Sequence, residues 1–310
     1  MTRIEIESHV LSLSNLDKVL FPDVGLTKGD LIDHYRGVAA LLLPHARDRA
    51  LTLHRFPDGI DQPGFYQQQR SSHFPDWIPG VTVPRVGDPG DEIPHVVCND
   101  EATLVYLANQ AVVTLHGWTS RCDRIDRPDR LVFDLDPPDG DSFAAVVVAA
   151  RRVRDLMQAI GLTPFVMTTG SKGLHVVAPL DAGSDFDAVR SVARAMAEVL
   201  TRRHPDTLTI AQRKSERRDR LYLDVSRNAW GQTSVLPYSV RAKPGAPVAT
   251  PVDWHEIGRK GFESRRYSVQ NLRRRLARKD DPWADIDRHA TSLEPVREAL
   301  LRLEDVGDAP

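Results

Sequence analysis

The stretch Leu131-Val-Phe-Asp-Leu-Asp-Pro-Pro-Asp-Gly140 strongly constrains how this chain can fold. Asp134 and Asp136 lie two residues apart in a run of β-forming residues, so a strand would project both carboxylates from one face. Pro137 and the residues after it cannot continue a paired strand. The acidic pair is therefore predicted at the C-terminal end of a strand, where open sheets tend to bind their ligands.

Two neighbouring carboxylates need a cation or several hydrogen-bond donors beside them. Hard oxygen ligands suit Mg²⁺ or Mn²⁺, and metal pairs held by carboxylates catalyse phosphoryl and nucleotidyl transfer. The alternative is a turn whose Asp side chains accept hydrogen bonds from backbone N–H groups. Asp224 ends another predicted strand in a similar apolar context, so a third acid could complete a two-metal cluster. The distance in sequence between Asp134 and Asp224 does not decide between these alternatives.

Composition narrows the class of protein. Hydrophobic residues make up 41% and charged residues 27% of the 310 residues, which is typical of a globular protein with a substantial core. Lys+Arg 41 against Asp+Glu 43 gives a net charge of -2, so any nucleic-acid surface must be a local patch. Cys98 and Cys122 form no Cys-x-x-Cys pair and favour a reducing compartment. No apolar run is long enough to cross a bilayer, so a cytoplasmic protein without a membrane partner is expected.

Hydrophobic periodicity divides the chain into helices and strands. Helices are predicted over 28–43, 101–110 with Asp100 as N-cap, 143–160 with Ser142 as N-cap, and 185–204. Strands are predicted over 4–13, 51–59, 64–70, 81–84, 112–118, 131–136, 164–169, 174–179, 220–225 and 235–241, and the rest of 71–95 is predicted to be loop. The charged connector Arg121–Arg130 is the predicted boundary between two lobes.

A helix is predicted to start at Thr27, because Thr27 and Asp30 resemble a capping box in which Asp replaces the usual Glu or Gln. Lys28 then lies at the helix N-terminus, where the helix dipole disfavours a cation. A visiting anion would resolve this conflict, because the first-turn N–H groups and the ammonium group can hold a phosphate together. The alternative is that Lys18 and Lys28 are solvated surface lysines.

Phe65 and Tyr66 are adjacent, so in a strand their side chains point to opposite faces. An exposed aromatic ring beside Arg55 and Arg70 could stack on a nucleobase. The alternative is that both rings pack in the core, which is the more common outcome.

Two further segments have a composition that suits anions. The turn Gly170–Gly173 brings two glycines, a hydroxyl and an ammonium group together, although it lacks the spacing of a P-loop and a strand follows it. The stretch Gly258–Lys279 is dense in Lys and Arg, with Arg273-Arg-Arg275 in a helical segment. A solvated surface is the alternative explanation of that run.

The ordered set of these motifs resembles the polymerase domain of bacterial ligase D, in the archaeo-eukaryotic primase superfamily. The resemblance covers nearly the whole chain. It is carried by Leu16-Asp-Lys-Val-Leu-Phe-Pro22, Thr27-Lys-Gly29, Arg55-Phe-Pro-Asp-Gly59, Pro63-Gly-Phe-Tyr66, Leu131-Val-Phe-Asp-Leu-Asp-Pro137, Thr168-Thr-Gly-Ser-Lys-Gly-Leu-His175 and Pro237-Tyr-Ser-Val-Arg241.

The resemblance assigns roles to individual residues. Three acids match the family's metal ligands: Asp134, Asp136 and Asp224. The residues implied to bind the nucleotide are Thr169, Ser171, Lys172, His175 and Arg241, with His116 matching a histidine implicated in nucleotide selection. Lys18 and Lys28 match lysines that bind a 5′-phosphate, and Phe65 matches an aromatic residue that stacks on template DNA. Arg55 and Tyr66, which are near Phe65 in the sequence, are predicted to bind DNA as well. His54 and Thr169 depart from the family's pattern, since Lys and Ser are expected there.

The resemblance implies an α+β fold with a mixed sheet, flanked by helices, that carries the acids. An N-terminal lobe of about residues 1–125 would bind DNA and a lobe of about residues 126–310 would be catalytic, within one primase-polymerase domain. The implied activity extends primer 3′ ends at gaps or breaks during end joining. Two Mn²⁺ or Mg²⁺ ions would be the cofactors and ribonucleotides the preferred substrates.

The implied partners are gapped or broken duplex DNA, NTPs or dNTPs, Ku and a DNA ligase, with the chain acting as a monomer at the nucleoid. The chain has no ligase motif Lys-x-Asp-Gly and no phosphoesterase region, and its termini favour a stand-alone relative over an excised domain. Two other functions stay open at this point. The chain could be a non-catalytic module that binds DNA ends, or a metal-dependent nuclease.

Overall fold

The computed structural model describes residues 2–85, 87–137 and 143–307. The chain divides into two compact units, and each contains its own large sheet. The first unit comprises Met1–Asp123, Thr233–Thr250 and Arg265–Asp281, and the second comprises Arg124–Gln232, Pro251–Ser264 and Pro282–Pro310. Each unit is thus assembled from segments that lie far apart in the sequence.

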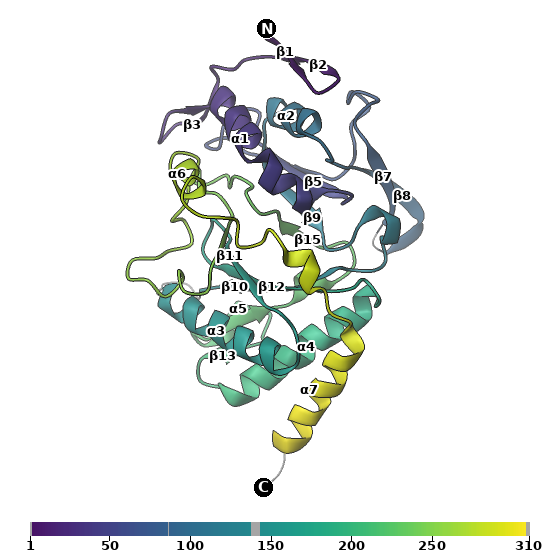
Figure 1. Ribbon diagram of the computed structural model, residues 1–310, viewed down its shortest axis with the longest axis vertical. Helices are drawn as coiled ribbons and strands as arrows, with labels where there is room; N and C mark the ends of the chain where they lie inside the picture. The colour runs from purple at the N-terminus through teal and green to yellow at the C-terminus, as the bar shows by residue number, and fades with distance from the viewer. Residues whose placement is uncertain (1, 86, 138–142, 308–310) are drawn as a thin grey trace. The chain divides into compact units, whose positions relative to one another are not determined.

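The elements confirm the predicted α+β class, with helices, an antiparallel sheet in the first unit and a mixed sheet in the second (Figure 1). The strands are β1 Thr2–Ile6, β2 His9–Leu13, β3 Val19–Phe21, β4 Leu26–Thr27, β5 Leu51–Arg55, β6 Phe65–Gln67, β7 Gly80–Arg85, β8 Asp88–Val96, β9 Val112–Trp118, β10 Arg130–Asp136, β11 Phe165–Thr168, β12 Leu174–Pro179, β13 Leu208–Thr209, β14 Leu221–Asp224, β15 Thr233–Val235 and β16 Thr250–Val252. The helices are α1 Lys28–Ala46, α2 Glu101–Asn109, α3 Phe143–Ala159, α4 Phe186–Arg203, α5 Lys214–Arg217, α6 Leu272–Leu276 and α7 Leu293–Gly307. The described residues also include the short 3-10 helices η1 Cys122–Arg124, η2 Ser226–Asn228 and η3 Ile286–His289.

The first unit is built on a sheet of order β15-β9-β5-β8-β7, with β6 paired to β5. Helix α1 begins as the sequence predicts, because Thr27 and Asp30 form a complete capping box. The Asp30 N–H donates to Thr27 Oγ1 at 3.2 Å, and the Thr27 N–H donates to Asp30 Oδ2 at 2.8 Å. Asp100 likewise caps α2 by accepting a hydrogen bond from the Thr103 N–H at 2.6 Å.

Two strand predictions and one loop prediction in this unit need correction. Residues 4–13 form a hairpin, β1–β2, with Glu7 at a positive φ of 53°, so one alternating run contains two strands. Residues 88–96, predicted as loop, form β8 opposite β7, because hydrogen bonds to a hairpin partner override the local Pro and Gly signals. The predicted strand 235–241 is wrong after β15, since Tyr238 takes a φ of +66° that turns the chain.

The second unit is built on a sheet of order β13-β14-β10-β12-β11-β16. Strand β10 is central and runs antiparallel to both neighbours, β12 and β14, while β13 and β14 are parallel. Helices α3 and α4 contact β10, and their buried positions recur with helical period. Gly161, at a φ of +86°, follows the end of α3, where this left-handed conformation favours glycine. The predicted N-cap Ser142 and the turn residues 138–140 lie outside the described residues.

Across the described ranges, no helix is both long and apolar enough to span a membrane.

Candidate active site

Strand pairing in the second unit brings the three predicted acids onto one face of the sheet. Asp134 on β10 lies directly opposite Asp224 on β14, and residues that face each other in an antiparallel pair share a face. Asp136 lies two residues further along β10 and therefore projects from that same face. On the other side of β10, Asp134 lies directly opposite His175 on β12. The predicted carboxylates and the predicted histidine thus converge, although they come from three strands.

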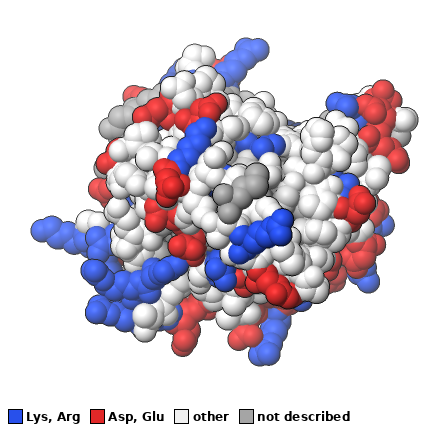
Figure 2. Space-filling model, turned by 90° about the horizontal axis from the view of Figure 1, so that it is seen from above, with Lys and Arg blue, Asp and Glu red and all other residues white. Residues whose placement is uncertain are grey.

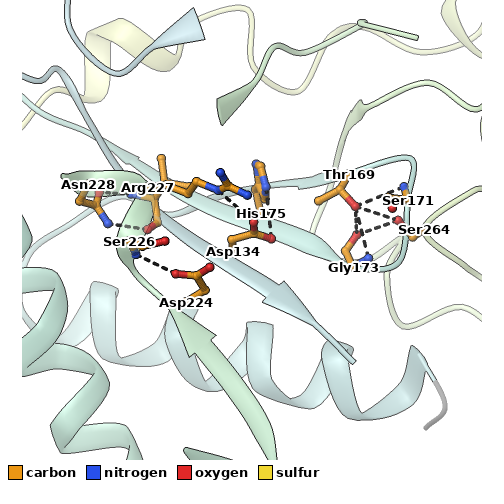
Figure 3. A network of polar contacts seen from close by, with 11 residues as sticks. Asp134, Thr169, Ser171, Gly173, His175, Asp224, Ser226, Arg227, Asn228 and Ser264 are labelled. Atoms are coloured by element: carbon orange, nitrogen blue, oxygen red, sulfur yellow. Dashed lines mark hydrogen bonds and ion pairs between the residues drawn. The ribbon is translucent and has the colours of Figure 1, made fainter. Parts of the chain in front are cut away.

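Asp134 is the centre of this group (Figure 3). Its side chain is 12% exposed, Oδ1 lies 3.4 Å from His175 Nε2, and Oδ2 accepts a hydrogen bond from Arg227 Nε at 3.2 Å. Burial alone would raise the pKa of Asp134, but the charges and hydrogen bonds of His175 and Arg227 outweigh it and hold that pKa at about 2. Asp134 is therefore an anion throughout the physiological pH range.

Arg227 and Asn228 were missed in the sequence, and both lie on η2 directly after β14. The Asn228 side chain accepts from the Val132 N–H and donates to the Val132 carbonyl, each at 2.8 Å, so it pairs with β10 as another strand would. The signal that could have identified Arg227 is its position three residues after Asp224. A turn there directs a cation back towards the acids.

Asp224 is held by its own turn and has an aromatic neighbour. Its Oδ1 accepts a hydrogen bond from the Ser226 N–H at 2.8 Å. Tyr222 lies opposite Asp136 in the strand ladder, and burial together with the charge of Asp224 raises the pKa of its hydroxyl group. The guanidinium of Arg217 lies over the Tyr222 ring at 4.2 Å from its centroid. Neither Tyr222 nor Arg217 was predicted from the sequence as a site residue.

The predicted anion cradle, Gly170–Gly173, is shaped from within by a buried threonine. Thr169 Oγ1 accepts from the N–H groups of Ser171 and Gly173, both at 3.3 Å, and donates to the Gly173 carbonyl at 3.1 Å. Ser264 Oγ also donates to that carbonyl, at 2.8 Å, and was missed in the sequence. Lys172 is exposed at the tip of the turn. Because Thr169 supports the turn, its predicted contact with a nucleotide stays a prediction.

Gly173 joins the cradle to the acids. A Cβ atom at Gly173 would lie 1.8 Å from the Leu135 carbonyl oxygen and 2.6 Å from Asp136 Oδ1, so only glycine fits there. The backbone of the turn is therefore packed closely against the end of β10, next to Asp136. A molecule with an anionic group in the turn would have that group close to the carboxylates.

The donor chemistry of the three acids fits the metals predicted from the sequence. Asp134, Asp136 and Asp224 supply hard oxygen atoms from one face, which suits Mg²⁺ or Mn²⁺. In the described part of the chain, no group of three or more His, Cys, Asp or Glu side chains is placed so that it could hold a metal ion. Asp134 is held by His175 and Arg227. Metal ligation by these residues stays a prediction.

In the first unit, Arg241 follows a segment that is fixed by buried hydrogen bonds. The Tyr35 hydroxyl donates to the Val113 carbonyl at 2.6 Å and accepts from the Val240 N–H at 3.2 Å. His34 Nε2 lies 3.1 Å from the Tyr238 carbonyl. These hydrogen bonds connect helix α1 to strand β9 and to the segment just before Arg241.

His116 lies on β9 within this first unit, and an aromatic residue is beside it. Its ring is 5.9 Å from that of Tyr66, at an angle of 64°. Tyr66 is 62% exposed and stacks on His54 at 4.0 Å, while Phe65 is 46% exposed beneath the guanidinium of Arg55. The interpretation that both aromatic rings pack in the core is therefore wrong.

His54 stands where the family's pattern has a lysine. Burial, followed by the charges of Arg241 and Lys243, lowers the pKa of His54 to about 4. This side chain is therefore neutral at pH 7.

Lys18 and Lys28 lie near each other at the start of α1. Lys28 is only 5% exposed, and its Nζ donates to the Asn109 carbonyl at 3.2 Å. Burial, followed by the charge of Lys18, lowers the pKa of Lys28. Lys18 pairs with Asp58 at 2.7 Å. Lys28 is at the helix N-terminus as predicted, Lys18 is close to it, and an acid contacts Lys18. Binding of a 5′-phosphate by the two lysines stays a prediction.

Comparison with known proteins identifies the family. The model of the LigD primase-polymerase domain matches residues 27–283. LigD of Mycobacterium tuberculosis, a multifunctional non-homologous end joining DNA repair protein, is 34% identical over 307 residues, which cover 96% of this chain and 39% of that protein. The bifunctional non-homologous end joining protein LigD of Bacillus subtilis is 30% identical over 295 residues, covering 95% of this chain and 47% of that protein.

A solved structure agrees with the sequence comparison. The polymerase domain of Mycobacterium tuberculosis ligase D, in complex with DNA, superimposes with a TM-score of 0.83 at 33% identity, covering 90% of this chain and 99% of that one. The chain belongs to the LigD primase-polymerase domain family. It spans less than half the length of the curated relatives named above.

The contact between Gly173 and β10 predicts the effect of a single methyl group. Gly173→Ala should lower the free energy of unfolding by about 1–3 kcal/mol or more, because the new Cβ collides with backbone that cannot move aside. Urea denaturation measures this difference. Gly90→Ala is the matched control, since a Cβ there meets only an ordinary contact at 3.6 Å. Equal stability of the two variants would contradict the close approach.

Proposed function

We propose that this chain is a nucleotidyltransferase that adds nucleotides to primer 3′ ends, directed by a template, at gaps or breaks in DNA. The observation that carries the proposal is the alignment of Asp134 and Asp224 across β10 and β14, with the anion cradle against the end of β10. Membership of the LigD family supports a role in end joining. Ku and a DNA ligase are the partners that we propose for this role.

The residues of the site would make two kinds of contact, one with metal ions and one with the triphosphate. Asp134, Asp136 and Asp224 would hold two Mn²⁺ or Mg²⁺ ions, which when bound supply the charge that activates a 3′-hydroxyl and stabilises a leaving pyrophosphate. Lys172 and the hydroxyl of Ser171 would hold the triphosphate, as groups that present positive charge and hydrogen-bond donors to phosphate oxygens. Arg227, placed against Asp134, would keep that carboxylate ionised and oriented. No protein general base is needed.

Asp136→Ala should abolish extension of a primer on a template with NTPs and Mn²⁺, while DNA affinity stays within about twofold. The reason is that the deleted carboxylate serves the metal and not the DNA phosphates. A gel assay of primer length and a fluorescence titration of DNA binding measure the two effects. Asp187→Ala, on the exposed first turn of α4, is the control. Shortened primers would indicate a nuclease, and DNA binding without extension by the unaltered protein would indicate an end-binding module.

The second part of the proposal concerns the sugar. The unaltered protein should use NTPs with a higher kcat/KM than dNTPs. In His116→Ala the ratio of kcat/KM for NTPs to kcat/KM for dNTPs should fall towards one, because the ring of His116 would contact the sugar. This role rests on the family resemblance together with the place of His116 beside Tyr66. Steady-state kinetics with both nucleotide types decide it, with His73→Ala as an exposed control. Equal kcat/KM values for the two sugars in the unaltered protein would refute the preference.

The third part is that Lys18 and Lys28 bind a 5′-phosphate on the downstream strand. The exposed ion pair of Lys18 with Asp58 is weak and can yield to a phosphate, which also offsets the repulsion between the two lysines. A gapped duplex with a 5′-phosphate should bind more tightly than one with a 5′-hydroxyl by about 1–3 kcal/mol. Lys18→Ala/Lys28→Ala should lose this difference, and Lys214→Ala/Lys260→Ala should keep it. If the first variant still discriminates, the phosphate is recognised elsewhere.

A further inference from the structure

One segment of the first unit has a local charge that the whole chain does not share. Residues 265–279, here called the basic surface, contain seven Lys or Arg and no Asp or Glu, whereas the complete chain has a net charge of -2. The seven are Arg265, Arg266, Arg273, Arg274, Arg275, Arg278 and Lys279. The acids that follow are Asp280, which is exposed, and Asp281, whose side chain is buried beside His45. Figure 2 shows that the Lys and Arg side chains of the visible face are unevenly distributed and are densest towards the lower left of the view.

The fold anchors this segment by its apolar side chains and leaves much of the charge in solvent. Leu272 on α6 is fully buried, and Tyr267 and Leu276 pack against the same core. Arg275 lies over the Tyr267 ring at 4.7 Å and donates to its hydroxyl at 3.0 Å. Arg266, Arg274 and Arg278 are exposed, and no carboxylate of the described residues forms an ion pair with them. Like charges held together in this way repel each other, so an anionic partner would stabilise them.

Contacts with α1 place the basic surface along the helix that begins at Lys28. Arg273 Nη2 donates to the Asp33 carbonyl at 2.8 Å, and it would lie 3.1 Å from a Cβ at Gly37. Asp33 is five residues after Lys28, which corresponds to about 7.5 Å along the helix axis. Along its own axis, one strand of duplex DNA carries a phosphate about every 3.4 Å, so about two phosphates span a comparable distance.

We propose that the basic surface binds the phosphate backbone of the duplex that flanks the gap or break. This inference rests on the proposed function, because DNA is its partner there, but it concerns residues outside the site that holds the acids. Arginine suits the contact, since its planar guanidinium pairs with phosphate oxygens through two parallel hydrogen bonds. Contacts of this kind position a protein on DNA without reading sequence. The position along α1 favours nucleic acid over an acidic protein as the partner.

The salt dependence of DNA binding tests the proposal. Arg266→Gln/Arg274→Gln/Arg278→Gln is compared with Arg190→Gln/Arg194→Gln/Arg203→Gln, which removes the same charge from α4. Affinity for a gapped duplex is measured against salt concentration, and circular dichroism confirms that each variant is folded. The slope of log affinity against log salt should become shallower by about 0.9 for each phosphate that is no longer neutralised, hence by up to about 2.7 in the first variant. Arg266→Lys/Arg274→Lys/Arg278→Lys should recover most of the slope.

The outcomes separate this inference from the proposed function. Support requires a shallower slope in the basic-surface variant alone, with primer extension at low salt and discrimination of a 5′-phosphate both retained. An unchanged slope overturns the inference, and so does a variant that loses only its binding to polyglutamate, which would assign the surface to an acidic protein. If the unaltered protein does not extend primers, the proposed function fails instead, whatever the slope.

Discussion

The contacts of Asp134 with His175 and Arg227 are the interactions on which the candidate active site depends. An unpaired buried carboxylate costs several kcal/mol, so Asp134 is stable in this position only with cationic or hydrogen-bonding partners on either side. One partner comes from β12 and the other from η2, directly after β14. The position of the acids therefore depends on the register of β10 with both neighbouring strands. A slip of β10 by one residue would turn Asp134 and Asp136 to the opposite face.

The same register fixes the cradle beside the acids. Strand β12 begins where the turn Gly170–Gly173 ends, so the pairing that places His175 beside Asp134 also holds Gly173 against Leu135 and Asp136. Thr169 and Ser264 donate hydrogen bonds to the Gly173 carbonyl of the turn, and Lys172 is exposed. Carboxylates and a cationic turn are thus parts of one rigid sheet. A site for charged phosphates needs this kind of fixed arrangement, because dipoles and charges placed in advance need not reorganise during the reaction.

In the first unit, helix α1 has a comparable organising role. Its capped N-terminus carries Lys28, its middle supplies His34 and Tyr35 to the segment before Arg241, and Arg273 of the basic surface contacts its outer side at Asp33. Residues that we assign to an end phosphate, to a nucleotide and to flanking duplex are therefore tied to one rigid element. The buried hydroxyl of Tyr35 is central to this arrangement, since leaving its backbone partners unsatisfied would cost their full desolvation.

The sequence by itself determined the elements whose signals are local. The capping box at Thr27 and Asp30, the Asp100 cap of α2, and the alternation that places Asp134 and Asp136 on one face all depend on residues within a few positions of each other. Motif order was also sufficient to recognise the family. Only the tertiary structure decided the rest, because strand pairing and buried charge join residues that are distant in sequence. In the structure, Asp224 lies opposite Asp134, and Arg227, which the sequence analysis missed, donates a hydrogen bond to Asp134. Thr169 stabilises the turn through its hydrogen bond to Gly173. At Tyr238 the chain turns, although local alternation predicted a strand there.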